Sequence, residues 1–127
     1  MKKIVYTLII LFIAQFNFAG EIDSILSKAR QLGEAKNYTE AIKVYETYIK
    51  NSDNENLKDV IVELANCYYL VGKKDIAVKY IKKAITKYGF IEEDFIYNNY
   101  LDENLSKYAL SKIYDDLEKL QAEYASR

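Results

Sequence analysis

Residues 58–89 read KDVIVELANCYYLVGKKDIAVKYIKKAITKYG and hold the pattern that decides the fold. Small and apolar residues recur there every three or four positions, as on one buried face of a helix: Ile61, Leu64, Ala65 and Tyr68. Gly72 and Gly89 can adopt the left-handed conformation that ends a helix. The stretch therefore predicts two helices, at about residues 55–71 and 74–88, joined by a tight turn.

The same pattern occurs 36 residues earlier, in residues 22–53. The matched positions are Ala29 and Ala65, Leu32 and Tyr68, Ala41 and Ala77, Tyr45 and Ile81, and Tyr48 and Ala84. This first unit predicts helices at about residues 21–36 and 37–50. Asn37 and Glu40 have the spacing of a capping box, in which each side chain accepts the other residue's backbone N–H. The sequence thus predicts two consecutive helix pairs.

Each unit resembles a tetratricopeptide repeat. That family has a small residue, a leucine or aromatic residue three positions on, an alanine nine further and a large residue four after that. The residues that carry the resemblance are Ala29, Leu32, Ala41 and Tyr45 in the first unit and Ala65, Tyr68, Ala77 and Ile81 in the second. The family's closing proline is absent, and the spacing is 36 residues rather than about 34. The resemblance implies an all-α fold, a short α-solenoid of antiparallel helix pairs.

Residues 90–127 are expected to cover the open end of the second unit, because a stable stack usually needs about three repeats. The segment predicts a short helix at about residues 91–100 and a long helix at about residues 105–124. We interpret it as a degenerate third repeat or a pair of capping helices, which completes a helical domain at residues 21–127.

A narrow apolar seam follows the last predicted helix, at alternating spacings of three and four residues: Leu110, Ile113, Leu117, Leu120 and Tyr124. Such a seam is similar to the a/d stripe of a coiled coil. It could pack back on the helix at residues 74–88, or it could drive self-association into a homodimer. Coiled coils normally continue for three or more heptads, which favours packing within the chain.

Residues 1–20, MKKIVYTLIILFIAQFNFAG, have the layout of a secretory signal peptide. Lys2 and Lys3 precede an apolar run, and small residues follow before Glu21. We expect this segment to be cleaved, the protein to be exported to the periplasm or the medium, and no stable membrane anchor to remain. The alternative is an uncleaved N-terminal anchor, although the apolar run is shorter than the roughly 20 residues that a spanning helix needs.

The composition argues against catalysis. The chain has 127 residues with no histidine and one cysteine, so it lacks the commonest general base and any cysteine pair for a metal or disulfide. After removal of residues 1–20 it has 16 basic and 19 acidic residues, a net charge of −3. We therefore expect a protein that is not an enzyme, holds no metal or cofactor and has no general affinity for nucleic acid.

The resemblance implies that the first helices of the two units line a groove for a peptide or another protein. Four residues on that face are candidates for binding: Arg30, Glu34, Asn66 and Tyr69. Arginine can hold a carboxylate through two hydrogen bonds, and asparagine can bond a peptide backbone. Leu26 and Val62 stand one turn earlier on the same face. We expect a non-enzymatic binding scaffold of the bacterial cell envelope or secreted space; the alternative is a self-associating structural envelope protein that uses the seam.

Overall fold

The computed structural model describes residues 18–52 and 56–127, with side chains from Ser24 onward. These residues form helices and no strands, which confirms the predicted all-α class. The α-helices are α2 (Phe18–Glu34), α3 (Tyr38–Asn51), α4 (Lys58–Leu70), α5 (Lys74–Tyr88), α6 (Asp94–Tyr97), α7 (Glu103–Ile113) and α8 (Leu117–Ala125), with a 3₁₀ turn, η1 (Tyr114–Asp116), between the last two.

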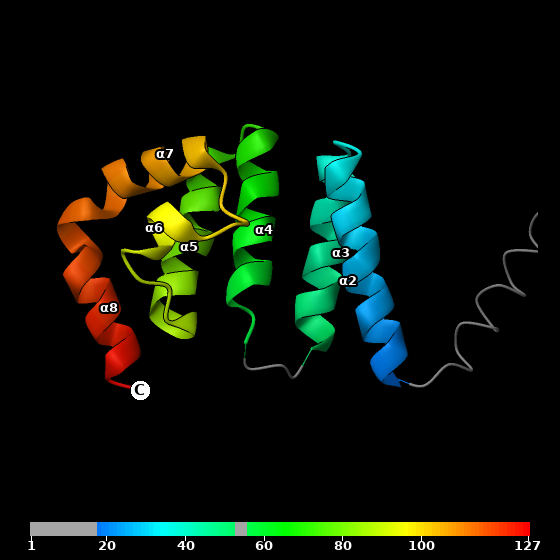
Figure 1. Ribbon diagram of the computed structural model, residues 1–127, viewed down its shortest axis with the longest axis horizontal. Coiled ribbons are helices and arrows are strands. Elements are labelled where there is room, and N and C mark those ends of the chain that lie inside the picture. Colours follow the sequence, from blue (N-terminus) through cyan, green and yellow to red (C-terminus); the bar gives the residue numbers. More distant parts are fainter. Residues whose placement is uncertain (1–17, 53–55) are drawn as a thin grey trace, which may run out of the picture.

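The first four described helices run alternately up and down (Figure 1). Helix α2 packs on α3, α3 on α4 and α4 on α5, and α7 and α8 both contact α5. Their bounds agree with the predicted ranges to within about three residues, because apolar periodicity and turn residues mark these helices strongly.

The two helix pairs have the same turn. Lys36 and Gly72 are both left-handed, with φ of 62° and 90°. After each, a backbone N–H reaches back five residues: Asn37 N donates to Leu32 O, and Lys73 N donates to Tyr68 O, both at 2.9 Å. This is the six-to-one hydrogen bond that closes a helix C-terminus. The repeat seen in the sequence is therefore present in the backbone.

The predicted capping box at Asn37 is wrong. The Asn37 side chain makes no cap hydrogen bond, and Lys73 at the equivalent position makes none either. The backbone angles are nearly the same, with φ and ψ of −91° and 67° at Asn37 and −91° and 64° at Lys73. The preceding turn sets the start of both helices, so this position does not depend on a capping side chain.

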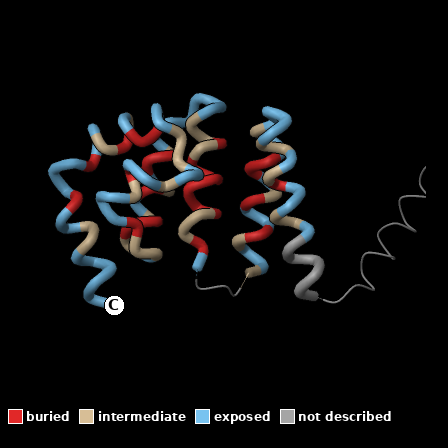
Figure 2. Tube along the Cα trace, in the orientation of Figure 1, coloured by how far each residue is buried: buried red, intermediate tan, exposed pale blue. Residues whose placement is uncertain are grey.

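Most positions of the predicted stripes are buried, and Figure 2 shows buried segments along α3, α4 and α5. Leu32 and Tyr68 are only partly buried. The alanines of the two helix pairs are fully buried: Ala29, Ala41, Ala65 and Ala77. Tyr45 and Ile81, which are larger, are also buried and fill the space between helices. Small residues let two helices approach closely, and inserting extra methylene groups at such tight positions typically costs about 1–3 kcal/mol.

The tail differs from the prediction at two points. The short helix expected at residues 91–100 is only the four residues of α6, and a turn follows it. The Asp102 side chain then accepts hydrogen bonds from Asn104 N at 2.8 Å and Leu105 N at 3.0 Å, so that it caps α7. The long helix expected at residues 105–124 is broken by η1, which lets α8 turn and pack on α5.

The C-terminal end of α8 is hydrogen-bonded to the last turn of α5. Arg127 Nε donates to Thr86 O at 2.8 Å. Gly89 ends α5 in the left-handed conformation, and an added Cβ there would lie 2.9 Å from the Tyr124 ring. The glycine thus serves both the backbone turn and the close approach of α8.

The predicted signal peptide falls mainly on residues 1–17, which lie outside the described residues. Its last three residues, 18–20, belong to the first turn of α2. None of the helices in the described part of the chain combines the length and the hydrophobicity needed to cross a membrane.

Candidate functional site

The facing sides of α2 and α4 hold a cluster of polar side chains around one buried carboxylate. Arg30 donates from Nε to Glu63 Oε1 at 2.8 Å and from Nη2 to Glu63 Oε2 at 3.0 Å. Tyr45 on α3 donates its hydroxyl to Glu63 Oε1 at 3.2 Å. The Glu63 side chain is 10% exposed and that of Arg30 is 40% exposed. This bidentate ion pair joins the two helix pairs.

The pKa values reflect this arrangement. The hydrogen bonds to Glu63 raise the pKa of Arg30 above its ordinary value, so its positive charge is fixed. Burial, and then the Glu63 carboxylate, raise the pKa of Tyr45. Tyr45 therefore remains a neutral hydrogen-bond donor at neutral pH.

Asn66, one turn after Glu63 on α4, holds a piece of the chain's own backbone. Its side-chain N–H₂ donates to Tyr100 O, and its side-chain oxygen accepts from Asp102 N at 2.9 Å. We call residues 98–102, between α6 and α7, the strap. Asn98 in the strap donates to Asp59 Oδ1 at 3.3 Å. Asparagine thus makes the backbone contact expected of it, but with a segment of the same chain.

The strap changes the surroundings of the predicted groove. Val62, expected on an open face, is fully buried, since the segment from α6 to α7 reaches α4 at Lys58, Asp59 and Asn66 on either side of it. The Tyr100 ring lies 5.7 Å from the Arg30 guanidinium carbon. We call the surface formed by Arg30, Glu34, Glu63 and Asn66 the α2–α4 face.

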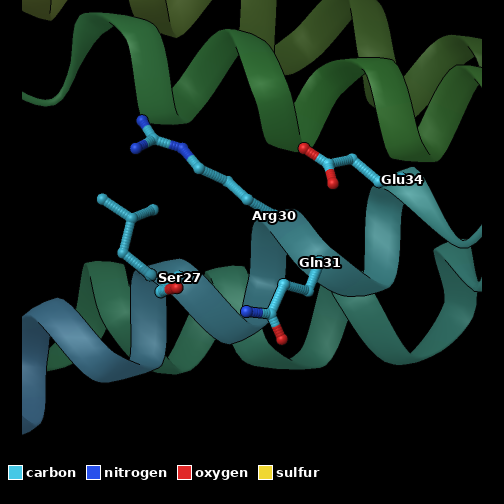
Figure 3. A pocket seen from close by; sticks show the side chains of 5 residues that line it. Ser27, Arg30, Gln31 and Glu34 are labelled. Carbon is cyan, nitrogen blue, oxygen red and sulfur yellow. The ribbon is translucent and has the colours of Figure 1, made fainter.

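Two hollows adjoin this face. One, of about 540 Å³, is lined by α2 residues including Leu26, Arg30 and Glu34. Figure 3 shows Arg30 and Glu34 directed toward the neighbouring helix, whereas Gln31 points away. The other, of about 380 Å³, lies between α2, α4 and the strap and is bordered by Leu70, which is 46% exposed. Solvent-accessible apolar and charged groups therefore occur side by side.

Tyr69 lies apart from Arg30 and Asn66. Its ring packs 6.0 Å from that of Tyr108 on α7, and Lys74 Nζ lies 5.5 Å from the Tyr69 ring and 5.4 Å from the Tyr108 ring. The structure thus brings Arg30, Glu34 and Asn66 around one surface, while Tyr69 belongs to the contact between α4 and α7.

The seam residues divide into three groups. Ile113 and Leu117 are buried, at 0% and 6% exposure, on either side of η1. Leu110 and Leu120 are partly buried and pack against the same core. Tyr124 is 46% exposed. Much of the seam is therefore already covered within one chain.

Cys67 is a buried free thiol next to the cluster. Burial, followed by the charge of Glu63, raises its pKa to about 11. A thiol in this state is a weak nucleophile at neutral pH. In the described residues no group of three or more potential metal-ligating His, Cys, Asp or Glu side chains is found.

Glu63 did not stand out in the sequence. Glu63 lies 33 residues from Arg30, and its neighbours Val62 and Leu64 are apolar, a context that signals a buried helix turn. An acidic residue inside such an apolar stretch is a usable signal, because a buried carboxylate requires a partner. Comparison of the chain with known protein families, curated proteins and solved structures gives no match.

Proposed function

We propose that this protein is a non-enzymatic scaffold that binds another protein or a peptide at the α2–α4 face. The observation that carries the proposal is the contact of Asn66 with the strap, in which one amide side chain satisfies both a backbone carbonyl and a backbone N–H. Such a contact requires no particular side chain on the bound segment. The adjoining hollows leave room for further segments beside it.

The tetratricopeptide-like organisation supports the same proposal. The turns at Lys36 and Gly72 repeat in the backbone, and the helix pairs follow one another along the chain. We take the chain to be a short solenoid of two repeat-like pairs, with α6, α7 and α8 as the cap. In such a stack the surface between successive first helices is continuous and presents aligned side chains to a ligand.

A displayed peptide library screened against the full-length chain tests the proposal. Selected peptides should bind to wild type, and Glu34→Lys on the face or Leu70→Ala at the adjoining hollow should weaken binding by about tenfold. The matched controls are Glu123→Lys on α8 and Ile96→Ala on α6, both at exposed positions. Absence of any binder, or equal losses in face and control variants by calorimetry, would reject the α2–α4 face as the binding surface.

Export is part of the proposal and rests on the sequence of residues 1–20. Mass determination of the protein recovered from envelope and medium fractions would locate the new N-terminus. A mature start near Glu21 supports cleavage, whereas an intact Met1 in the membrane fraction supports the anchored alternative.

The self-associating alternative has less support. A second copy that used the seam would first have to expose Ile113 and Leu117, which are buried within one chain. Size exclusion coupled to light scattering distinguishes the binding scaffold from the self-associating structural protein. A mass that stays that of one chain at all concentrations excludes self-association.

A further inference from the structure

The strap occupies the α2–α4 face through contacts that any peptide could make. Asn66 bonds the carbonyl of Tyr100 and the N–H of Asp102, which are backbone groups two residues apart. Neither bond depends on the strap's side chains. A separate peptide that presents a carbonyl and, two residues later, an N–H on the same side would satisfy Asn66 equally well.

Asn98 and Tyr100 of the strap add weaker and more exposed side-chain contacts, whereas Leu101 packs against the core and Asp102 caps α7. The guanidinium of Arg30 is held by Glu63 and lies 5.7 Å from the Tyr100 ring centroid, a cation–π distance. Tyr100 itself is 43% exposed. Asn98 donates to Asp59 and accepts from Tyr100 N at 2.9 Å. No side chain of the strap is fully buried.

The residues on either side of the strap are, by contrast, firmly held. Phe95 packs edge-on against Phe90 with ring centroids 4.9 Å apart, and Leu105 is fully buried. Ser106 Oγ donates to Phe95 O at 2.8 Å, which ties the two ends together. The backbone bonds to Asn66 can therefore open while α6 and α7 keep their places, with Leu101 still packed against the core and Asp102 still capping α7.

We propose that the strap is an internal ligand of the α2–α4 face, and that the partner is a tyrosine-containing peptide segment that displaces it. This inference rests on the proposed function and specifies its partner and its regulation. The incoming segment supplies the carbonyl and N–H to Asn66 and places an aromatic ring on Arg30. A tethered competitor acts at a local concentration of the order of millimolar, so the strap lowers the affinity for external peptides.

A labelled peptide copying residues 96–104, IYNNYLDEN, is the probe, and fluorescence anisotropy with the full-length chain gives its affinity. The double variant Asn98→Ala/Tyr100→Ala removes the strap's side-chain contacts with Asp59 and Arg30, and it leaves Asn66, the core contact of Leu101 and the α7 cap at Asp102 in place. It should bind the probe at least about tenfold more tightly than wild type, because its internal competitor is weakened.

The matched control is Tyr97→Ala/Asn104→Ala, which changes the same residue types at exposed positions on either side of the strap. It should bind the probe as wild type does. Adding Asn66→Ala to the loosened variant should abolish the gain, and so should replacing the central tyrosine of the probe by alanine. Thermal unfolding checks that the variants are folded, and Tyr100→Ala alone serves if the double variant is not.

Equal affinities for wild type, control and loosened variant would overturn the inference, as would binding that survives Asn66→Ala. A loosened variant that forms dimers by light scattering would show that a second copy's strap is the occupant, which also contradicts an external peptide. Library-selected peptides that bind wild type and the loosened variant equally would refute the internal ligand but leave the proposed function standing. Failure of every peptide to bind either protein would refute both.

Discussion

Lys36 and Gly72 lie 36 residues apart and end α2 and α4 in the same left-handed conformation, with φ of 62° and 90°. A residue with a Cβ is strained in this region by about 1–2 kcal/mol, whereas glycine is not. The two helix pairs thus share one turn, but only the second has the residue that suits it. The first pair carries a backbone strain that the second avoids.

Replacing Lys36 by glycine should therefore stabilise the protein. We expect Lys36→Gly to raise the free energy of unfolding by about 1 kcal/mol, less the part that glycine loses through its more flexible unfolded chain. Urea unfolding followed by circular dichroism measures the change. The exposed Lys36 side chain makes no ion pair among those found in the described residues, so little else is removed.

The converse change is Gly72→Ala. No atom lies within 4 Å of an added Cβ there, so the backbone conformation alone sets the cost. A loss of about 1 kcal/mol is expected. If Lys36→Gly destabilises the chain or Gly72→Ala has no effect, the shared left-handed turn is not a source of strain.

Removal of Arg30 alone should lower the free energy of unfolding substantially, because it leaves the Glu63 carboxylate without its cationic partner. Arg30→Ala leaves the buried Glu63 carboxylate with only the Tyr45 hydroxyl among its described partners. Loss of one partner of a fully buried pair costs about 3–5 kcal/mol. Because the Arg30 side chain is 40% exposed, we expect about 2 kcal/mol, measured by urea unfolding.

The double variant Arg30→Ala/Glu63→Gln tests this explanation. It removes the unpaired charge, so it should be more stable than Arg30→Ala alone. The pair of exposed residues Lys107 and Glu103 gives the control, since the same treatment there should change stability by less than about 0.5 kcal/mol. Strictly additive effects of the two changes at Arg30 and Glu63 would contradict a coupled buried pair.

The contact between Gly89 and Tyr124 should make α8 sensitive to a single methyl group. Gly89→Ala both strains the left-handed backbone and places a Cβ 2.9 Å from the Tyr124 ring. We expect a loss of about 1–2 kcal/mol, of which about 1 kcal/mol is backbone strain. Hydrogen exchange should show faster opening of α8 than in wild type.

Tyr124→Ala in the Gly89→Ala background separates the two causes. Removal of the ring relieves the steric part but not the backbone strain. The effect of Gly89→Ala should therefore be smaller in the Tyr124→Ala background than in wild type. An unchanged effect in the two backgrounds would show that the ring moves aside freely and that its contact with Gly89 does not hold α8.

The helix pairs could be predicted because the residues that specify each helix and turn lie close together in the sequence. The alanines at 29, 41, 65 and 77 lie on regular stripes, and the turn residues stand at the same spacing in both units. Helix bounds then follow from periodicity and from residues that end helices. The same locality explains the error at Asn37, where a capping sequence is present but the preceding turn already sets the helix start.

The tail and the α2–α4 face could be predicted only in part, because their contacts join distant residues. The strap is placed by Asn98 on Asp59 and by Asp102 on Asn66, contacts that span 39 and 36 residues. The break at η1 is hidden because the apolar spacing from Leu110 to Leu120 continues through it. Arg30 and Asn66 were identified from the sequence, but their partners within the chain were not.

The buried thiol of Cys67 should make stability depend on alkaline pH. Burial raises its pKa from 9.0 to about 11, so between these values the unfolded thiol ionises while the folded one keeps its proton. The unfolded state then binds fewer protons, and the free energy of unfolding falls as pH rises, by up to about 1.4 kcal/mol per pH unit. The stabilisation from the protonated thiol is complete below pH 9 and is lost through the window up to about pH 11.

Cys67→Ala removes this pH-dependent stabilisation, so the stability advantage of wild type over this variant should shrink between pH 8 and 10.5 in urea titrations. A difference that stays constant with pH would mean that the thiol is as accessible in the folded chain as in the unfolded one.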